Sequence, residues 1–429
     1  MKVSITTLGC KVNSYESEAV LEQLVSRGYT AVDFTEKSDI YIINTCMVTN
    51  TAEAKSRKIV HRPLKLNPDA IIVVMGCWTQ LKAEEVLAIP GVKIVLGTVH
   101  REHIPDFIEE YLRDKVPLNK VSSLTKDIQY DKLLIEDFKG HHRAFLKIQD
   151  GCNNYCTYCI IPYTRGRVRS KPKEQVLLEA KELVKHGHYE IILTGIHTGG
   201  YGEDLKEVTF GSLLEALESI EGLKRIRISS IEISELTDEV IDLIAKSKKI
   251  VNHLHIPLQG GTNRILKLMN RKYTLEDYSD KIKDLRQKIK NLAITTDIIA
   301  GFPTETDKDH VEALEFISKI GFFELHVFPY SKRNGTLSAK MTPEVDGVVK
   351  KVRVQDFLEL STVLAKAFIQ SQIGILQEVV FETEKDGYLE GHTSNYIQVK
   401  AIADRTLIGE VVNVTIVEEN YPVSIAKIQ

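Results

Sequence analysis

The chain has 429 residues, of which 43% are hydrophobic and 27% charged, a composition typical of folded proteins at a length that favours about three domains. Its 56 Lys and Arg against 59 Asp and Glu give a formal net charge of -3, which neither indicates nor excludes nucleic-acid binding, because such binding needs only a local basic patch. No run approaches the ~18 apolar residues of a spanning helix, and the first residues are too polar for a secretory signal, so we expect a cytoplasmic protein without membrane contact.

Short apolar runs alternate with helical patterns over residues 1–120, which predicts an α/β domain with a parallel sheet covered by helices on both faces. The expected strands are 3–8, 40–44, 70–75 and 92–96. The expected helices are 14–27, with Ser14 as N-cap, and 51–66, ended by Asn67-Pro68. The mixed, polar residues 121–140 are interpreted as a linker.

The alternation resumes over residues 141–365 and predicts a partial (β/α)6 barrel. Its expected strands are 144–149, 190–194, 225–229, 253–257, 293–299 and 324–328, and a long helix is expected over 348–372. Residues 366–429 change character, because short β-rich runs are broken by Gly and Asn, which is typical of a small all-β barrel. Its expected strands are 379–384, 388–393, 397–399, 409–417 and 424–428.

Three of the six cysteines follow successive predicted strands of the first domain: Cys10, Cys46 and Cys77. A long cytoplasmic chain is not expected to carry a disulfide framework. The carboxyl ends of parallel strands meet at one edge of a sheet, where open α/β folds bind ligands. We therefore expect these three thiols to be neighbours in space, although each alone could be a small buried residue at a strand end.

The other three cysteines, Cys152, Cys156 and Cys159, form a CxxxCxxC motif directly after a predicted strand. Three thiolates from one compact loop can hold three irons of a [4Fe–4S] cluster and leave the fourth iron open for a ligand. A zinc site is the main alternative, but it would need a fourth ligand that is not obvious nearby. Unligated structural cysteines remain a second alternative.

This motif, with Tyr158 before its last cysteine, resembles that of the radical S-adenosylmethionine (radical SAM) superfamily. The resemblance implies that the open iron binds SAM and that reductive cleavage of SAM yields a 5′-deoxyadenosyl radical that abstracts hydrogen from the substrate. It also implies a SAM-binding role for residues after later strands: Thr194, Gly195, Ser230, Glu232, Gln259 and Gly301. The segment before Gly301 departs from the pattern, since Asp297 stands where the superfamily has Gly.

The segments 7–13, 44–49 and 75–80 around the first three cysteines resemble the amino-terminal domain of radical SAM methylthiotransferases. The resemblance covers essentially the whole chain, including a tail that resembles a TRAM domain, a small RNA-binding barrel. It implies a second [4Fe–4S] cluster on Cys10, Cys46 and Cys77, two SAM molecules per turnover, and an electron donor such as flavodoxin or ferredoxin.

The form Thr-Leu-Gly-Cys-Lys-Val-Asn at 7–13 resembles the branch that modifies C2 of N6-threonylcarbamoyladenosine at position 37, in the tRNA anticodon arm (MtaB-type). The isopentenyladenosine branch reads closer to Y-G-C-Q-M-N, and the ribosomal-protein branch closer to L-G-C-P-K-N. Both remain alternative substrates, and a metal-stabilised RNA-binding scaffold remains the non-enzyme alternative.

The predicted TRAM tail is not strongly basic, so we expect RNA contacts elsewhere. Positive charges alternate directly after the central cysteine motif, at Arg165, Arg167, Arg169 and Lys171. Phosphate neutralisation there would bring the anticodon arm close to the radical. The alternative is an ordinary solvated loop.

Overall fold

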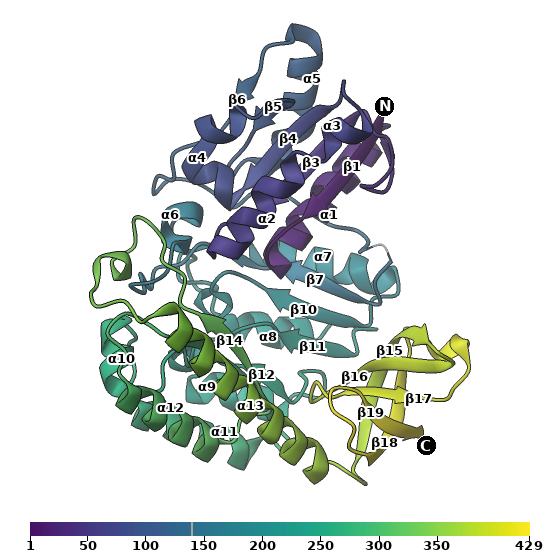
Figure 1. Ribbon diagram of the computed structural model, residues 1–429. Helices are drawn as coiled ribbons and strands as arrows, with labels where there is room; N and C mark the ends of the chain where they lie inside the picture. The colour runs from purple at the N-terminus through teal and green to yellow at the C-terminus, as the bar shows by residue number, and fades with distance from the viewer. Residues whose placement is uncertain (139) are drawn as a thin grey trace.

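The computed structural model describes residues 1–138 and 140–429 and consists of three parts, which Figure 1 shows from top to lower right. Residue 139, within the predicted linker, lies outside the described residues. Among the described residues, no helix combines the length and the apolar character that crossing a membrane requires.

The N-terminal part is a parallel sheet in the order β2-β1-β3-β4-β5-β6. The strands are β1 (Lys2–Thr7), β2 (Thr30–Ala31), β3 (Ile40–Thr45), β4 (Ile71–Gly76), β5 (Val92–Val95) and β6 (Leu118–Asn119). The helices are α1 (Lys11–Ser26), α2 (Asn50–Val60), α3 (Pro63–Leu66), α4 (Cys77–Leu87), η1 (Arg101–His103) and α5 (Ile104–Asp114). Every residue of β3 and β4 is buried, as expected for strands covered on both faces.

Two predicted helix boundaries in this part are wrong. The first helix starts at Lys11 with Cys10 as its N-cap, so Ser14 lies inside the helix. The predicted helix 51–66 is divided into α2 and α3, because Pro63 lacks an N–H and its ring would clash with the carbonyl one turn earlier. Pro63 instead occupies the first turn of α3, where proline is tolerated.

The central part contains two parallel sheets, β11-β10-β7 and β12-β13-β14, which form an open barrel. Its strands are β7 (Arg143–Lys147), β10 (Glu190–Thr194), β11 (Arg225–Ile228), β12 (His253–His255), β13 (Ala293–Ala300) and β14 (Glu324–Pro329). The predicted strand 144–149 is interrupted at Ile148, and the short β8 (Gln149–Asp150) pairs antiparallel with β9 (Arg169–Ser170).

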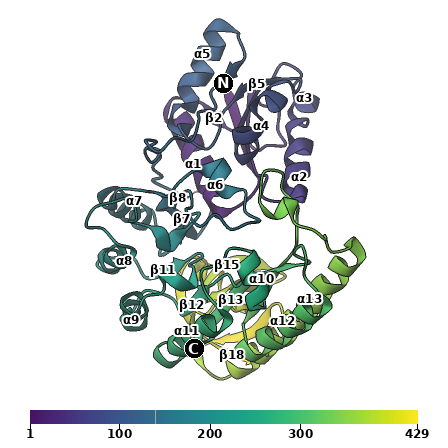
Figure 2. The same ribbon diagram turned by 90° about the vertical axis from the view of Figure 1, so that its left-hand side faces the viewer.

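Helices surround these strands, and the barrel lies below the N-terminal sheet in two perpendicular views (Figures 1 and 2). They are α6 (Ile161–Arg165), α7 (Lys173–Lys185), η2 (Thr198–Gly200), α8 (Phe210–Glu218), η3 (Ile233–Glu235), α9 (Asp238–Lys246), α10 (Asn263–Leu268), α11 (Leu275–Lys288), α12 (Asp307–Ile320) and η4 (Ser338–Lys340).

The C-terminal part is a closed barrel in the order β15-β16-β17-β19-β18. Its elements are β15 (Leu376–Lys385), β16 (Tyr388–Thr393), β17 (Gln398–Ala401), η5 (Arg405–Leu407), β18 (Val411–Glu418) and β19 (Ser424–Ile428). The predicted fold class, an α/β domain, a partial (β/α) barrel and a small all-β barrel, is therefore confirmed.

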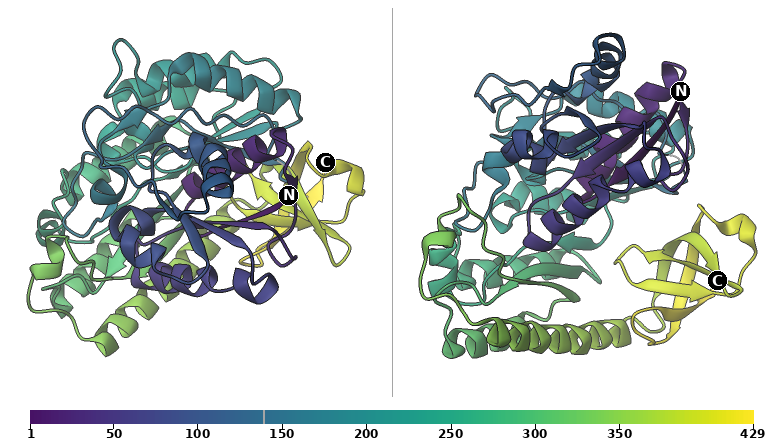
Figure 3. Two further views of the ribbon diagram at one scale, coloured as in Figure 1. Left: turned by 90° about the horizontal axis from the view of Figure 1, so that it is seen from above. Right: turned by 45° about the horizontal axis from the view of Figure 1, so that its top comes forward.

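Helix α13 (Gly347–Ser371) connects the central part to the C-terminal barrel, and Figure 3 shows it as one long element leading to that barrel. Phe357 packs in the large core that the first two parts share, whereas Ala365 and Ile369 pack in the core of the C-terminal barrel. The helix thus belongs to both cores, and the predicted domain boundary between residues 365 and 366 falls within it.

Candidate functional site

Cys10, Cys46 and Cys77 lie at one edge of the N-terminal sheet, after β1, β3 and β4. A Cβ atom on Gly9 would lie only 3.0 Å from Cys46 Cβ and 3.3 Å from its Sγ, so the loop that carries Cys10 contacts Cys46. Burial, together with the nearby thiols of Cys77 and Cys10, raises the pKa of Cys46 to about 11. The structure therefore brings the three predicted thiols together.

A polar frame fixes the backbone around these thiols. Asn13 Nδ2 donates to the carbonyl oxygens of Leu8 at 2.8 Å and Thr45 at 3.2 Å, which ties the two cysteine loops together. Gly76, directly before Cys77, has φ +108°, and a Cβ atom there would lie 2.5 Å from the carbonyl oxygen of Thr45. Only glycine therefore fits at this position without moving a neighbouring loop.

Cys152, Cys156 and Cys159 lie in the loop between β8 and α6. The backbone N–H of Asn154 donates to Cys152 Sγ at 3.4 Å, and Arg271 Nη1 donates to Cys156 Sγ at 3.4 Å. Burial, together with the neighbouring thiol of Cys156, raises the pKa of both Cys152 and Cys159 to about 12.

The donor chemistry of both cysteine sets fits an iron–sulfur cluster. Thiols with raised pKa values stay protonated in the protein alone, and metal binding deprotonates such thiols outright. Each set offers three soft donors within one compact region, which leaves a cluster one ligand short. The two predicted sets of three cysteines are thus chemically suited to hold a [4Fe–4S] cluster each.

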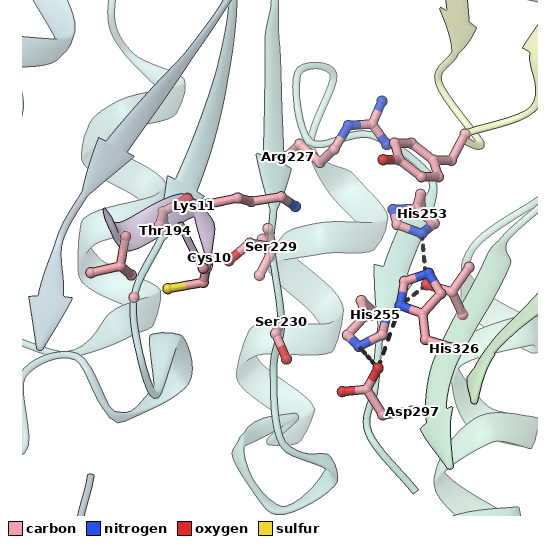
Figure 4. Close-up of a pocket in the computed structure, with 16 residues that line it drawn as sticks. Cys10, Lys11, Thr194, Arg227, Ser229, Ser230, His253, His255, Asp297 and His326 are labelled. Atoms are coloured by element: carbon pink, nitrogen blue, oxygen red, sulfur yellow. Dashed lines mark hydrogen bonds and ion pairs between the residues drawn. The ribbon is translucent and has the colours of Figure 1, made fainter. Parts of the chain in front are cut away.

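Cys10 also lines a cavity of about 410 Å³ whose other walls come from the central barrel and the C-terminal barrel. Figure 4 shows the labelled side chains around this space. The predicted SAM residues Thr194, Gly195 and Ser230 line it. The wall residues that the sequence analysis did not identify include Lys11, Arg227, His253, His255, His326 and Tyr396.

A second cavity of about 230 Å³ is lined by Tyr158, Cys159 and Gln259, all of them predicted site residues. Asp297 lines both cavities, so its carboxylate lies between the space beside Cys10 and the space beside Cys159. His255 Nε2 and His326 Nδ1 lie 3.2 Å and 3.4 Å from Asp297 Oδ1. Burial would raise the pKa of Asp297, but these two histidines hold it well below its usual range.

Two predicted SAM residues lie outside both cavity walls. The carboxylate of Glu232 forms an ion pair with Arg271, the same arginine that contacts Cys156. The backbone N–H of Gly301 donates to Glu305 Oε1 at 3.1 Å. Glu232 therefore holds Arg271 beside Cys156, whereas Gly301 lies in the turn after β13.

The predicted RNA contacts are wrong for three of the four residues. Arg165 and Lys171 are fully buried, and Arg169 is 8% exposed. Arg165 is paired with Glu16 and Asp150, Arg169 with Asp150, and Lys171 with Glu179. Arg167 alone among the four is exposed, so it remains a candidate phosphate contact.

Comparison with known proteins relates both cysteine-bearing parts to described families. Residues 146–317 match the radical SAM superfamily, and residues 2–97 match the uncharacterized protein family UPF0004. The solved structure of a radical S-adenosylmethionine methyltransferase, TsrM from Kitasatospora setae, superposes with a TM-score of 0.59 at 13% identity, over 79% of this chain and 76% of that chain. At this identity the similarity supports the fold alone.

Curated relatives cover almost the whole chain. Threonylcarbamoyladenosine tRNA methylthiotransferase MtaB of Bacillus subtilis is 47% identical over 98% of this chain and 94% of its own length. The tRNA-2-methylthio-N(6)-dimethylallyladenosine synthase of Clostridium botulinum is 37% identical over 97% of this chain and 94% of its own length.

Proposed function

Since the chain belongs to the radical SAM tRNA methylthiotransferases, we propose that it adds a methylthio group to C2 of N6-threonylcarbamoyladenosine at position 37 of tRNA. The MtaB relatives of Bacillus subtilis and Aquifex aeolicus, at 47% and 37% identity, support this substrate. The proposal assigns residues 1–120 to the methylthiotransferase domain, 141–365 to the radical SAM core and 366–429 to a TRAM domain, with 121–140 as a linker.

The observation that carries the proposal is the position of Cys10 in the wall of the barrel cavity, beside Thr194, Gly195 and Ser230. Methylthiolation needs a sulfur site and a hydrogen-abstraction site that face the same substrate carbon. The cavity is also large enough for a modified nucleoside, because ligand pockets typically measure about 300–1,000 Å³.

Membership of the radical SAM superfamily implies a [4Fe–4S] cluster and SAM. In our proposal Cys152, Cys156 and Cys159 hold this cluster, and Cys10, Cys46 and Cys77 hold a second one. When bound, the first would supply the electron for SAM cleavage and the second the sulfur for transfer, with one SAM used for each role. The physiological electron donor would be a small reductant such as flavodoxin or ferredoxin.

The protein groups around the central cysteines would orient SAM and exclude water. Tyr158 and Gln259 line the cavity beside Cys159, and the almost buried Arg271 places a positive charge next to Cys156. That charge would stabilise thiolates that burial otherwise disfavours. The exposed Arg167 is the proposed contact for a phosphate of the anticodon arm.

Nucleoside analysis of tRNA tests the proposal directly. A strain that lacks this protein should accumulate the threonylcarbamoyl nucleoside and lose its 2-methylthio derivative, and the intact gene should restore it. Loss of the 2-methylthio dimethylallyl nucleoside instead would assign the substrate of the Clostridium botulinum relatives. A change confined to a ribosomal protein would overturn the tRNA assignment.

A further inference from the structure

The wall of the 410 Å³ cavity carries the cations Lys11 and Arg227 and one carboxylate, Asp297, which the two histidines already pair. Arg227 belongs to a cluster of charged groups that extends behind this wall. On the barrel side, Arg225 Nε and Arg227 Nε lie 3.0 Å and 2.8 Å from the oxygens of Glu190. Arg143 lies 3.8 Å from Glu190 and 2.6 Å from Glu382. Three largely buried guanidinium groups therefore share two carboxylates, and Arg227 is the one that lines the cavity. The surplus positive charge in this cluster favours an anion in the cavity next to Arg227.

Lys11 adds a further positive charge from the opposite wall. It is the first residue of α1 and directly follows Cys10. The side chain is exposed to the cavity, and across the described residues 1–138 and 140–429 no carboxylate forms an ion pair with it. Figure 4 shows Lys11 reaching across the cavity on the side where Arg227 and His253 lie.

The proposed substrate brings an anion to this place. An N6-threonylcarbamoyl group carries a free carboxylate, whereas a dimethylallyl group is neutral and apolar. On adenine, C2 and the N6 substituent lie on the same Watson–Crick edge of the ring. When C2 faces the sulfur site beside Cys10, a substituent on N6 can reach the part of the wall that Lys11 and Arg227 form.

We propose that Lys11, supported by the surplus positive charge around Arg227, is an anion subsite that binds the carboxylate of the substrate's N6 substituent and so selects against neutral substituents. This inference rests on the proposed function and names the part of the site that sets its specificity. A charge-assisted bond in a partly enclosed cavity discriminates strongly, because a neutral analogue would cover the Lys11 ammonium without pairing its charge.

Equilibrium binding of anticodon stem-loops to the reconstituted full-length protein tests the subsite. The ligands are the threonylcarbamoyl stem-loop, the same stem-loop with its carboxylate methyl-esterified, and one with unmodified adenosine. We expect the native protein to bind the acid about tenfold or more tightly than the ester. Lys11→Gln should remove this preference, Lys11→Arg should retain it, and the exposed Lys37→Gln, at the opposite end of the sheet, should not change it.

Other results would overturn the inference. If the native protein binds acid and ester equally, no carboxylate subsite exists, whether or not any variant folds. If Lys11→Gln weakens all three stem-loops equally, Lys11 contacts an RNA phosphate. If the variant instead raises the KM for SAM in the cleavage assay, the anion is the SAM carboxylate. Failure of the proposed function is separate, because the native protein would then form no 2-methylthio product on any of these stem-loops.

Discussion

Arg165 on α6 donates from Nη1 to Glu16 Oε1 on α1 at 2.8 Å, and both side chains are fully buried. The same guanidinium donates from Nη2 to Asn13 Oδ1 at 2.6 Å. It therefore joins the central part to the frame that holds the Cys10 and Cys46 loops. Lys147 and Arg101 also pair with Glu16, at 2.7 Å and 3.0 Å.

Arg165→Met should destabilise the fold by about 3–5 kcal/mol, because it leaves the buried carboxylates of Glu16 and Asp150 short of a partner. Urea unfolding of the two proteins would measure this difference. The matched control is Arg167→Met, two residues later but exposed, which should stay within about 0.5 kcal/mol of the native protein. Equal effects of the two substitutions would contradict the structural role of Arg165.

Gly76→Ala should impair cluster binding by the first cysteine set, since its Cβ would collide with the carbonyl oxygen of Thr45 at 2.5 Å. Iron analysis should fall from about eight to about four atoms per chain, while SAM cleavage continues. Gly28→Ala is the control: it has φ +86° but open space around its Cβ, so it should show backbone strain of about 1–2 kcal/mol and full iron content.

Substitutions in the two cysteine sets should affect two different activities, SAM cleavage and methylthio transfer. Cys152→Ala should abolish cleavage of SAM to 5′-deoxyadenosine, because the proposed cluster beside the SAM cavity loses a ligand. Cys10→Ala should retain cleavage and lose methylthio transfer. Product analysis by mass spectrometry distinguishes them, and continued transfer by the Cys10 variant would show that the first set does not supply sulfur.

Acid should weaken the contact between α2 and the segment after β14. Burial would raise the pKa of Glu53, but hydrogen bonds from Lys82, Arg333 and Arg57 outweigh it and lower the pKa to about 2. The ion pairs therefore stabilise the fold fully above the unfolded-state pKa of about 4.5, and this contribution is lost as the pH falls from there toward 2.

Glu53→Gln provides the comparison for this pH dependence. Urea unfolding midpoints of the variant should lie below those of the native protein at pH 7, and the gap should narrow as the pH is lowered through 4. A gap that stays constant from pH 7 to pH 3 would show that the charge of Glu53 contributes nothing.

Most strands follow from the sequence, because apolar runs such as β3 and β4 leave little choice in a covered parallel sheet. The basic stretch after the central motif shows where local pattern fails. Alternating charges resemble a solvated loop, but the partner of Arg165 is Glu16, 149 residues away in sequence. An ion pair with a carboxylate so distant in sequence leaves no signal in the stretch itself, so the burial of Arg165 could not be predicted from it.

The polar cavity wall did leave a signal that the sequence analysis did not use. Arg225-Ile-Arg227 and His253-Leu-His255 repeat a polar–apolar–polar pattern on β11 and β12. Alternate residues of a barrel strand face its interior, so polar residues at those positions of adjacent strands indicate a wet interior. The position of Lys11 in the cavity wall could not be predicted from local sequence, because it depends on how the N-terminal part packs against the central barrel.

Tyr396 of the C-terminal barrel stacks on His253 with ring centroids 4.5 Å apart, and the guanidinium of Arg227 lies over the ring of Tyr396. That barrel is carried by α13, whose 25 residues span about 37 Å at a helical rise of 1.5 Å. A single residue inserted between Phe357 and Ala365 would turn everything beyond it by about 100°. The length of α13 therefore fixes the orientation of the C-terminal barrel, and with it the position of Tyr396 in the cavity wall. The number of residues between Phe357 and Ala365 thus shapes the cavity as directly as the side chains that line it.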